Sequence, residues 1–286
     1  MAGLADSLSN RLAWATLRAV CRAAMRRVDA RVEGLEHLPA TGPAIIAARH
    51  YHHFYDGAAL LTLAPRPMRI LVTLDWAENP AVQRAMAAAC QAAGWPVVPR
   101  AFRLPPPALA GAARHALRAA TRQSVGLLRA GRVLLVFPEG YPTIDPSNTP
   151  KSRDDEILPF QPGFLRFASL AERAGQTRVP IVPAGLEYAR GERWRLTVRF
   201  GEPATIVPGV SLEQQVNAIE RQVRWLSGIG SAPPVATSAP ITGPERSVIT
   251  DAVTTNAAVI AMRSRSIRRK ASSGDICCRP CERRDP

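Results

Sequence analysis

Three of the five histidines lie together in one short segment, at His50, His52 and His53, and Asp56 follows them closely. Imidazole has an unperturbed pKa of about 6.5, so a histidine oriented by a carboxylate can act as a general base near neutral pH. The same groups are also of the types that bind zinc. The segment therefore indicates an enzyme, either one that activates a hydroxyl group or one that uses a metal.

Two further polar sites follow segments that are typical of strands. Glu139 and Gly140 come after the apolar run over 133–137, and Arg100 ends a short apolar segment. Because the carboxyl ends of parallel strands meet at one edge of a sheet, we expect these groups to lie near the histidine segment. A base, a cation and a second carboxylate together suit activation of a hydroxyl on an anionic molecule.

Segments typical of strands alternate with segments typical of helices from about residue 28 to about residue 228. This alternation predicts an α/β fold with a largely parallel central sheet flanked by helices. The predicted organisation is an N-terminal amphipathic helix over 1–27, one catalytic domain over 28–228 and a disordered basic tail over 229–286. The expected strands are 28–32, 43–48, 69–74, 132–137, 179–184 and 195–200.

The chain is strongly basic, with a net charge of +14, of which the predicted tail carries +4. Most of the excess therefore belongs to the folded domain, which predicts an anionic partner: phospholipid headgroups, phosphorylated small molecules or nucleic acid. Aromatic residues are only 6% of the chain, and we expect no specific nucleic-acid partner.

The N-terminal segment places four arginines on one helical stripe, and these are Arg11, Arg18, Arg22 and Arg26. Such a helix either packs on the core or lies in a membrane interface. No run of about 18 apolar residues occurs, so we expect no transmembrane helix. The five cysteines suggest no disulfide framework, which favours a reducing compartment.

Four short motifs follow one another along the chain. They are His50 to Asp56, Gly94 to Arg100, Phe137-Pro138-Glu139-Gly140 and Val179-Pro180-Ile181-Val182-Pro183. In these motifs and their order, the sequence resembles, over about residues 28–228, the glycerolipid acyltransferase family typified by 1-acyl-glycerol-3-phosphate acyltransferases.

The resemblance implies transfer of a fatty acyl group from an acyl thioester to a hydroxyl of a lysophospholipid or a glycerol-phosphate-like acceptor. The thioester would be acyl-CoA or acyl carrier protein, acting as co-substrate, with no cofactor and no metal. His50 would be the general base, and Asp56 would orient it and stabilise the imidazolium. The reaction would take place at the cytoplasmic face of a membrane, with the protein bound peripherally to its anionic surface.

The resemblance also implies the substrate contacts. Arg100, Glu139 and Gly140 would bind the acceptor, and Pro180 and Pro183 would line the acyl site. Two other functions remain open at this point: a metal-dependent hydrolase that uses the histidine cluster, and a non-catalytic basic module that binds membranes.

The spacing of the histidine motif departs from that of the family, because five residues rather than four separate His50 from Asp56. On a regular helix, His52 or His53 would face Asp56. His50 reaches Asp56 only if the segment is a loop with one extra residue bulged out. We favour His50 as the base, with His53 and then His52 as the alternatives.

A second departure follows Gly140. The family usually continues with a threonine and an arginine that contacts phosphate, whereas this chain has Tyr141-Pro142. Lys151 or Arg153 could supply that charge from the following loop. Alternatively, the acceptor is not glycerol phosphate.

Overall fold

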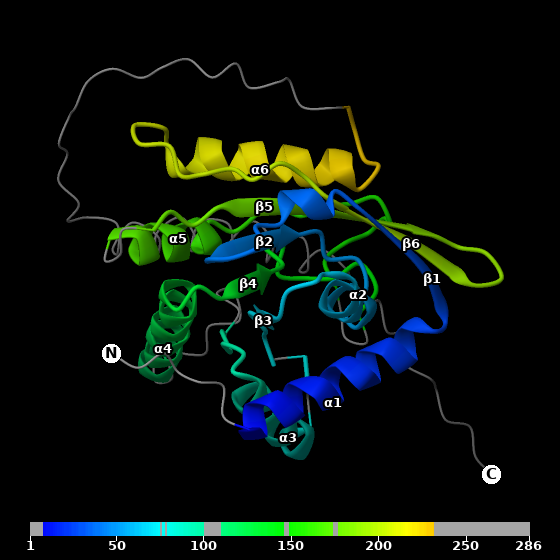
Figure 1. Cartoon of the computed structure of the whole chain (residues 1–286), viewed down its shortest axis with the longest axis horizontal. Helices are drawn as coiled ribbons and strands as arrows, with labels where there is room; N and C mark the ends of the chain where they lie inside the picture. Colours follow the sequence, from blue (N-terminus) through cyan, green and yellow to red (C-terminus); the bar gives the residue numbers. More distant parts are fainter. Residues whose placement is uncertain are drawn as a thin grey trace, which may run out of the picture. The chain divides into compact units, whose positions relative to one another are not determined.

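The computed structural model describes residues 8–74, 76–77, 79–99, 110–145, 149–173 and 177–231 (Figure 1). Arg100 and nearly all of the predicted tail over 229–286 lie outside the described residues. The helices are α1 (Leu8–Met25), the short η1 (Leu35–His37), α2 (Tyr55–Leu63), α3 (Pro80–Ala93), α4 (Ala110–Arg129), α5 (Gly163–Arg173) and α6 (Leu212–Leu226). The strands are β1 (Val28–Glu33), β2 (Ala44–Ala48), β3 (Met68–Ile70), β4 (Val133–Val136), β5 (Ile181–Ala189) and β6 (Trp194–Phe200).

The strands form one sheet in the order β1-β6-β5-β2-β4-β3. Four of the five neighbouring pairs are parallel, and only β5 and β6 are antiparallel. The prediction of an α/β fold with a largely parallel sheet flanked by helices is therefore confirmed. β2 lies between two parallel neighbours and is buried along its whole length, as expected for a continuously apolar strand.

Each face of the sheet carries its own apolar core, because successive side chains of a strand point to opposite faces. Ile46 belongs to the core that also contains residues of α1 and α2. Ile45 and Ala47 belong to the core on the other face, with residues of α4, α5 and α6. Figure 1 shows α6 on the side of the sheet opposite α1 and α2.

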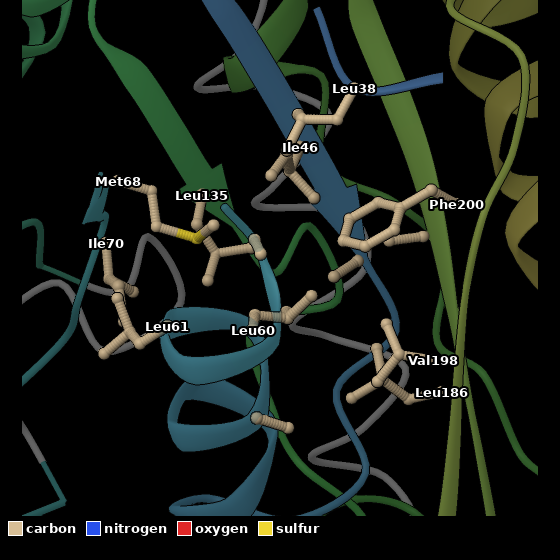
Figure 2. Packing of buried hydrophobic residues seen from close by; sticks show 14 of the residues in the cluster. Leu38, Ile46, Leu60, Leu61, Met68, Ile70, Leu135, Leu186, Val198 and Phe200 are labelled. Carbon is tan, nitrogen blue, oxygen red and sulfur yellow. The ribbon is translucent and has the colours of Figure 1, made fainter. Parts of the chain in front are cut away.

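Helix α2 directly follows the histidine segment and is held firmly on the sheet. Leu60 is fully buried and Leu61 almost so. In Figure 2, Leu61 lies toward Met68 and Ile70, while Leu60 lies nearer the middle of the sheet. Packing of α2 on the sheet therefore fixes the position of Asp56, in its first turn, relative to the ends of the strands.

Helix α1 packs on the protein itself. Cys21 is buried in the core, and Trp14, Leu17 and Met25 pack against it. Of the two interpretations of this segment, the described contacts are those of a helix that covers the core. Among the described residues, no helix is both long enough and apolar enough to cross a bilayer.

The end of α6 approaches the backbone of β5 very closely at Gly185. A Cβ atom added to Gly185 would lie 2.2 Å from the carbonyl carbon of Leu226. That atom belongs to the main chain at the end of a helix, so it cannot rotate away as a side chain does. Gly185 therefore sets the distance between α6 and the sheet.

We expect Gly185→Ala to lower the free energy of unfolding by roughly 3 kcal/mol, the upper end of the usual cost of overpacking. Gly126→Ala is the matched control, since Gly126 is exposed within α4 and its added Cβ would meet nothing within 4 Å. This control should instead gain about 0.5–1 kcal/mol, because alanine favours a helix interior. Urea unfolding followed by circular dichroism measures both, and an unchanged Gly185→Ala midpoint would contradict the close approach.

Candidate active site

The imidazole of His50 and the carboxylate of Asp56 lie against each other just beyond the carboxyl end of β2. His50 Nδ1 is 2.9 Å from Asp56 Oδ2. The Asp56 side chain is fully buried, whereas 15% of the His50 side chain is exposed. The His50 ring also stacks on Phe137, with ring centroids 4.2 Å apart. The ring is thus fixed both at one nitrogen and on one face.

This contact decides which nitrogen of His50 can take up a proton. A carboxylate only accepts hydrogen bonds, so Nδ1 carries the hydrogen and donates it to Asp56. The lone pair is then on Nε2, which has no hydrogen-bond partner among the described residues. A buried carboxylate that fixes the tautomer and stabilises the imidazolium is the arrangement of a general base.

Asp56 also shapes the loop that carries His50. Its Oδ2 accepts hydrogen bonds from the backbone N–H groups of Tyr51, at 2.6 Å, and His52, at 2.9 Å. Its Oδ1 accepts one from the hydroxyl of Tyr188 at 2.7 Å. Asp56 lies in the first turn of α2, where a negative charge is also favoured by the helix dipole. The loop therefore wraps around the side chain that orients the His50 ring.

The other two histidines point elsewhere. His52 Nδ1 accepts the backbone N–H groups of Phe54 and Tyr55 at the start of α2, at 3.2 and 3.4 Å. Burial lowers the pKa of His52, which favours its neutral form. His53 is exposed, and its Nδ1 lies 3.4 Å from the carbonyl oxygen of Ile144. Of the three imidazoles, it is that of His50 that contacts the Asp56 carboxylate.

The carboxylate of Glu139 is the second anchor of the His50 loop. Its Oε1 accepts the backbone N–H of His50 at 2.7 Å, and its Oε2 accepts the backbone N–H of Leu158 at 3.0 Å. Sheet register explains this placement, because Ala44 of β2 lies opposite Val133 of β4. His50 and Glu139 each lie six residues after this pair, so the register brings them to the same level.

Lys151 completes this anchor as a buried ion pair. Its Nζ lies 2.6 Å from Glu139 Oε2, and neither side chain is exposed. The same ammonium group donates to the carbonyl oxygen of His50 at 2.7 Å and to Thr143 Oγ1 at 3.4 Å. Burial lowers the pKa of Lys151, and Glu139 opposes that shift. The ion pair therefore satisfies both backbone polar groups of His50, the N–H through Glu139 and the C=O through Lys151.

Arg49, the residue before His50, fastens the same loop to the sheet and to the segment over 149–158. Its guanidinium group donates to the carbonyl oxygens of Leu186 and Asp154 and lies over the ring of Tyr51. Burial lowers the pKa of Arg49. The residues on both sides of the imidazole are thus held by contacts from distant parts of the chain.

The remaining predicted site residues lie in different places. Gly140 lies next to Glu139 with φ 76°, a backbone conformation that favours glycine. Pro183 is buried within β5 opposite Ala47, and Pro180 precedes β5 at the sheet edge away from His50. The structure therefore brings Glu139 and Gly140 to His50 but not the two prolines, whose role in an acyl site stays a prediction.

Sequence reasoning missed Tyr188 and gave Lys151 a different role. Tyr188 lies in β5, far along the chain from the histidine segment, and no local motif marks it. Lys151 could have been singled out from the sequence, because lysine is rare in it. The chain has two lysines, Lys151 and Lys270, among 37 lysines and arginines. A compact ammonium group with three donors suits this enclosed position better than a planar guanidinium.

The histidine cluster does not have the geometry of a metal site. In the described part of the chain, no group of three or more His, Cys, Asp or Glu side chains is arranged to hold a metal ion. The rings of His52 and His53 stack on each other, with centroids 4.8 Å apart, while His50 turns to Asp56. This geometry gives no support to the metal-dependent hydrolase.

The sequence matches the acyltransferase family over residues 29–187, which is more than half of the chain. The chain belongs to the acyltransferase family. The predicted family is thereby confirmed. The acyltransferase is also similar in fold to a solved structure, the 1-acyl-sn-glycerophosphate (LPA) acyltransferase PlsC from Thermotoga maritima, with a TM-score of 0.52 and 18% identity. That match covers 76% of this chain and 78% of the other, and no curated protein matches the sequence.

We expect the Lys151–Glu139 pair to be strongly coupled in stability. Lys151→Met or Glu139→Gln alone leaves a buried group without its partner, which should cost the acyltransferase about 3–5 kcal/mol. The double variant should cost clearly less than the sum, as measured by urea unfolding. The exposed pair Arg153–Asp155 is the control, with an expected coupling of about 0.5 kcal/mol. Additive single effects at Lys151 and Glu139 would contradict the ion pair.

Tyr188→Phe should lower the free energy of unfolding of the acyltransferase by about 1.5–3 kcal/mol near neutral pH, because Asp56 loses one donor. Burial and the adjacent Asp56 raise the pKa of Tyr188 well above 10. Above about pH 10 the unfolded chain therefore loses a proton that the folded chain keeps, and the wild type loses stability. The difference between wild type and variant should shrink between about pH 9 and about pH 11. A difference that stays constant would show that Tyr188 is not bonded in this way.

Proposed function

We propose that this acyltransferase moves a fatty acyl group from an acyl thioester to a hydroxyl of a lysophospholipid or a glycerol-phosphate-like acceptor at a membrane surface. The observation that carries the proposal is the His50–Asp56 pair, in which Nδ1 donates to a buried carboxylate and Nε2 remains able to accept a proton. Membership of the acyltransferase family supplies the reaction class.

The proposed reaction is a direct transfer. Nε2 of His50 takes the proton of the acceptor hydroxyl as its oxygen attacks the thioester carbonyl carbon. The tetrahedral intermediate then expels the thiolate, which takes the proton back from His50. Asp56 stabilises the imidazolium between these two steps, and the new ester and the free thiol leave the site.

Glu139 and Lys151 contribute to this reaction by positioning. Both oxygens of Glu139 already accept hydrogen bonds from the protein, and Lys151 is enclosed. We therefore assign the Glu139–Lys151 pair to holding the peptide of His50, so that its ring meets the acceptor hydroxyl in one fixed orientation. A base held in this way loses little freedom when the substrate binds.

Three features favour a lipid-related acceptor and an anionic surface. The chain carries a net charge of +14. The similar solved structure is of a protein whose name states action on 1-acyl-sn-glycerophosphate. Phe54, next to the histidine segment, has 42% of its surface exposed. We propose a peripheral position at the cytoplasmic face of a membrane, with acyl-CoA or acyl carrier protein as the acyl donor.

His50→Ala should reduce acyl transfer at least about 100-fold, because general-base catalysis typically contributes at least that much. The assay supplies labelled acyl-CoA or acyl carrier protein with a panel of lysophospholipids and glycerol phosphate, and it measures labelled product. His52→Ala and His53→Ala should each lose far less activity than His50→Ala. Loss in either of these variants together with an active His50→Ala would show that the base is another histidine.

The surface variant His115→Ala controls for loss of a histidine as such, since His115 is exposed on α4. Thermal unfolding of each variant separates loss of the base from loss of the fold. Failure of every acceptor and donor in the panel with folded wild-type protein would exclude the proposed substrates.

A further inference from the structure

Two of the cations that the sequence offers for anion binding beside His50, Lys151 and Arg153, already have partners within the protein. Lys151 is enclosed by its contacts with Glu139 and the His50 carbonyl oxygen. Arg153 forms an ion pair with Asp155 at 2.9 Å. Lys151 is thus closed to a ligand, and other cations at this edge of the sheet are candidates for binding phosphate.

An open hollow of about 500 Å³ provides them. It is lined by Arg26, Arg27, Arg190, Gly191, Glu192, Arg193 and Trp194. Its volume lies within the range of roughly 300–1,000 Å³ that is usual for small-molecule sites. Four guanidinium groups against one carboxylate give this hollow a clear excess of positive charge.

The arginines of the hollow have few partners of their own. No ion pair or side-chain hydrogen bond connects Arg26, Arg27 or Arg193 to another residue in the described ranges. Arg190 has more contacts: it lies over the ring of Trp194, interacts with the hydroxyl of Tyr51 and forms a long, exposed ion pair with Asp154 at 3.9 Å. Guanidinium groups that repel one another and have free donors favour an anion between them, and their planar forks match phosphate oxygens.

The topology places the hollow at the same edge of the sheet as His50. Arg190 and Arg193 lie in the turn between β5 and β6, and β5 runs parallel to β2. Val28 of β1 lies opposite Trp194 of the parallel strand β6, so Arg26 and Arg27, which directly precede β1, lie beside that turn. From the β2–β5 register, the turn lies roughly 13 Å beyond the level of His50, at about 3.3 Å per residue.

A layer of aromatic rings joins the hollow to the catalytic pair. The ring of Trp194 lies at the edge of the rings of Tyr51 and Tyr188, with centroids 6.4 and 5.8 Å away. Tyr51 and Tyr188 stack at 4.5 Å, and Tyr188 donates to Asp56. A ligand in the hollow would thus contact Trp194, whose ring packs against the two tyrosines beside the active site.

We propose that this hollow binds a phosphate ester, supplied either by a lipid headgroup or by a soluble phosphorylated ligand such as the phosphoadenosine end of coenzyme A. The proposal extends the proposed function, but binding is measured without turnover, so either can fail independently of the other.

The experiment uses the full chain and two double variants. The first combines Arg190→Ala and Arg193→Ala, in the β5–β6 turn. The second combines Arg26→Ala and Arg27→Ala, in the segment before β1. The control is Arg84→Ala with Arg118→Ala, which removes the same charge from exposed positions on α3 and α4. Two probes are used: phosphatidylcholine vesicles containing phosphatidylglycerol, followed by co-sedimentation, and adenosine 3′,5′-bisphosphate, followed by calorimetry. Thermal unfolding checks that every variant is folded.

Each hollow variant should weaken binding of at least one probe by about ten-fold or more, while the control changes it by less than about three-fold at the same salt concentration. Loss of vesicle binding alone identifies a lipid headgroup, loss of bisphosphate binding alone identifies a soluble ligand, and loss of both identifies shared use. Equal losses in control and hollow variants, or no loss in either, would overturn the proposal. The two double variants change different segments of the hollow. If one of them does not fold, the other still tests the proposal.

Discussion

The structure depends on the buried carboxylate of Asp56. Four donors converge on it, from the His50 ring, two backbone N–H groups of the loop and the Tyr188 hydroxyl. Buried charge is tolerated only when its hydrogen-bonding capacity is filled, so this loop has little freedom to adopt another path. The contact that orients the His50 imidazole is therefore also the contact that determines the local fold.

A buried ion pair usually stabilises a fold no more than apolar residues of the same size would. The Lys151–Glu139 pair is needed here because it satisfies backbone polar groups of His50. β2 ends at Ala48, so the N–H and C=O groups of His50 lie beyond the sheet ladder and need other partners. One donor and one acceptor are required at adjacent points, and the Lys151–Glu139 pair supplies both. Two apolar side chains could fill the same space but would leave both groups unsatisfied.

The sequence predicted the parts of the site that local pattern and sheet geometry determine. The apolar runs predict β2 and β4, and parallel register then brings His50 and Glu139 to one edge. The sequence left open which of the three histidines contacts Asp56, because that depends on where α2 begins. Asp56 bonds back to the loop over four to six residues, in a local geometry that regular helical spacing does not predict. Tyr188 was not predictable, because its partner lies 132 residues away along the chain.

The described cations near the site fall into two groups by burial. Arg49 and Lys151 are buried, and their donors go to backbone carbonyls and to Glu139, so they hold the loop in place. The arginines around the β5–β6 turn are largely exposed and keep donors available to solvent. Desolvating a cation costs free energy unless the protein supplies its partners, whereas an exposed one can exchange water for a ligand. Where the family usually has an arginine, this chain has Pro142, and its loop cation is used to support His50. In the proposed phosphate site, anion recognition would rest on arginines that the fold leaves exposed to solvent.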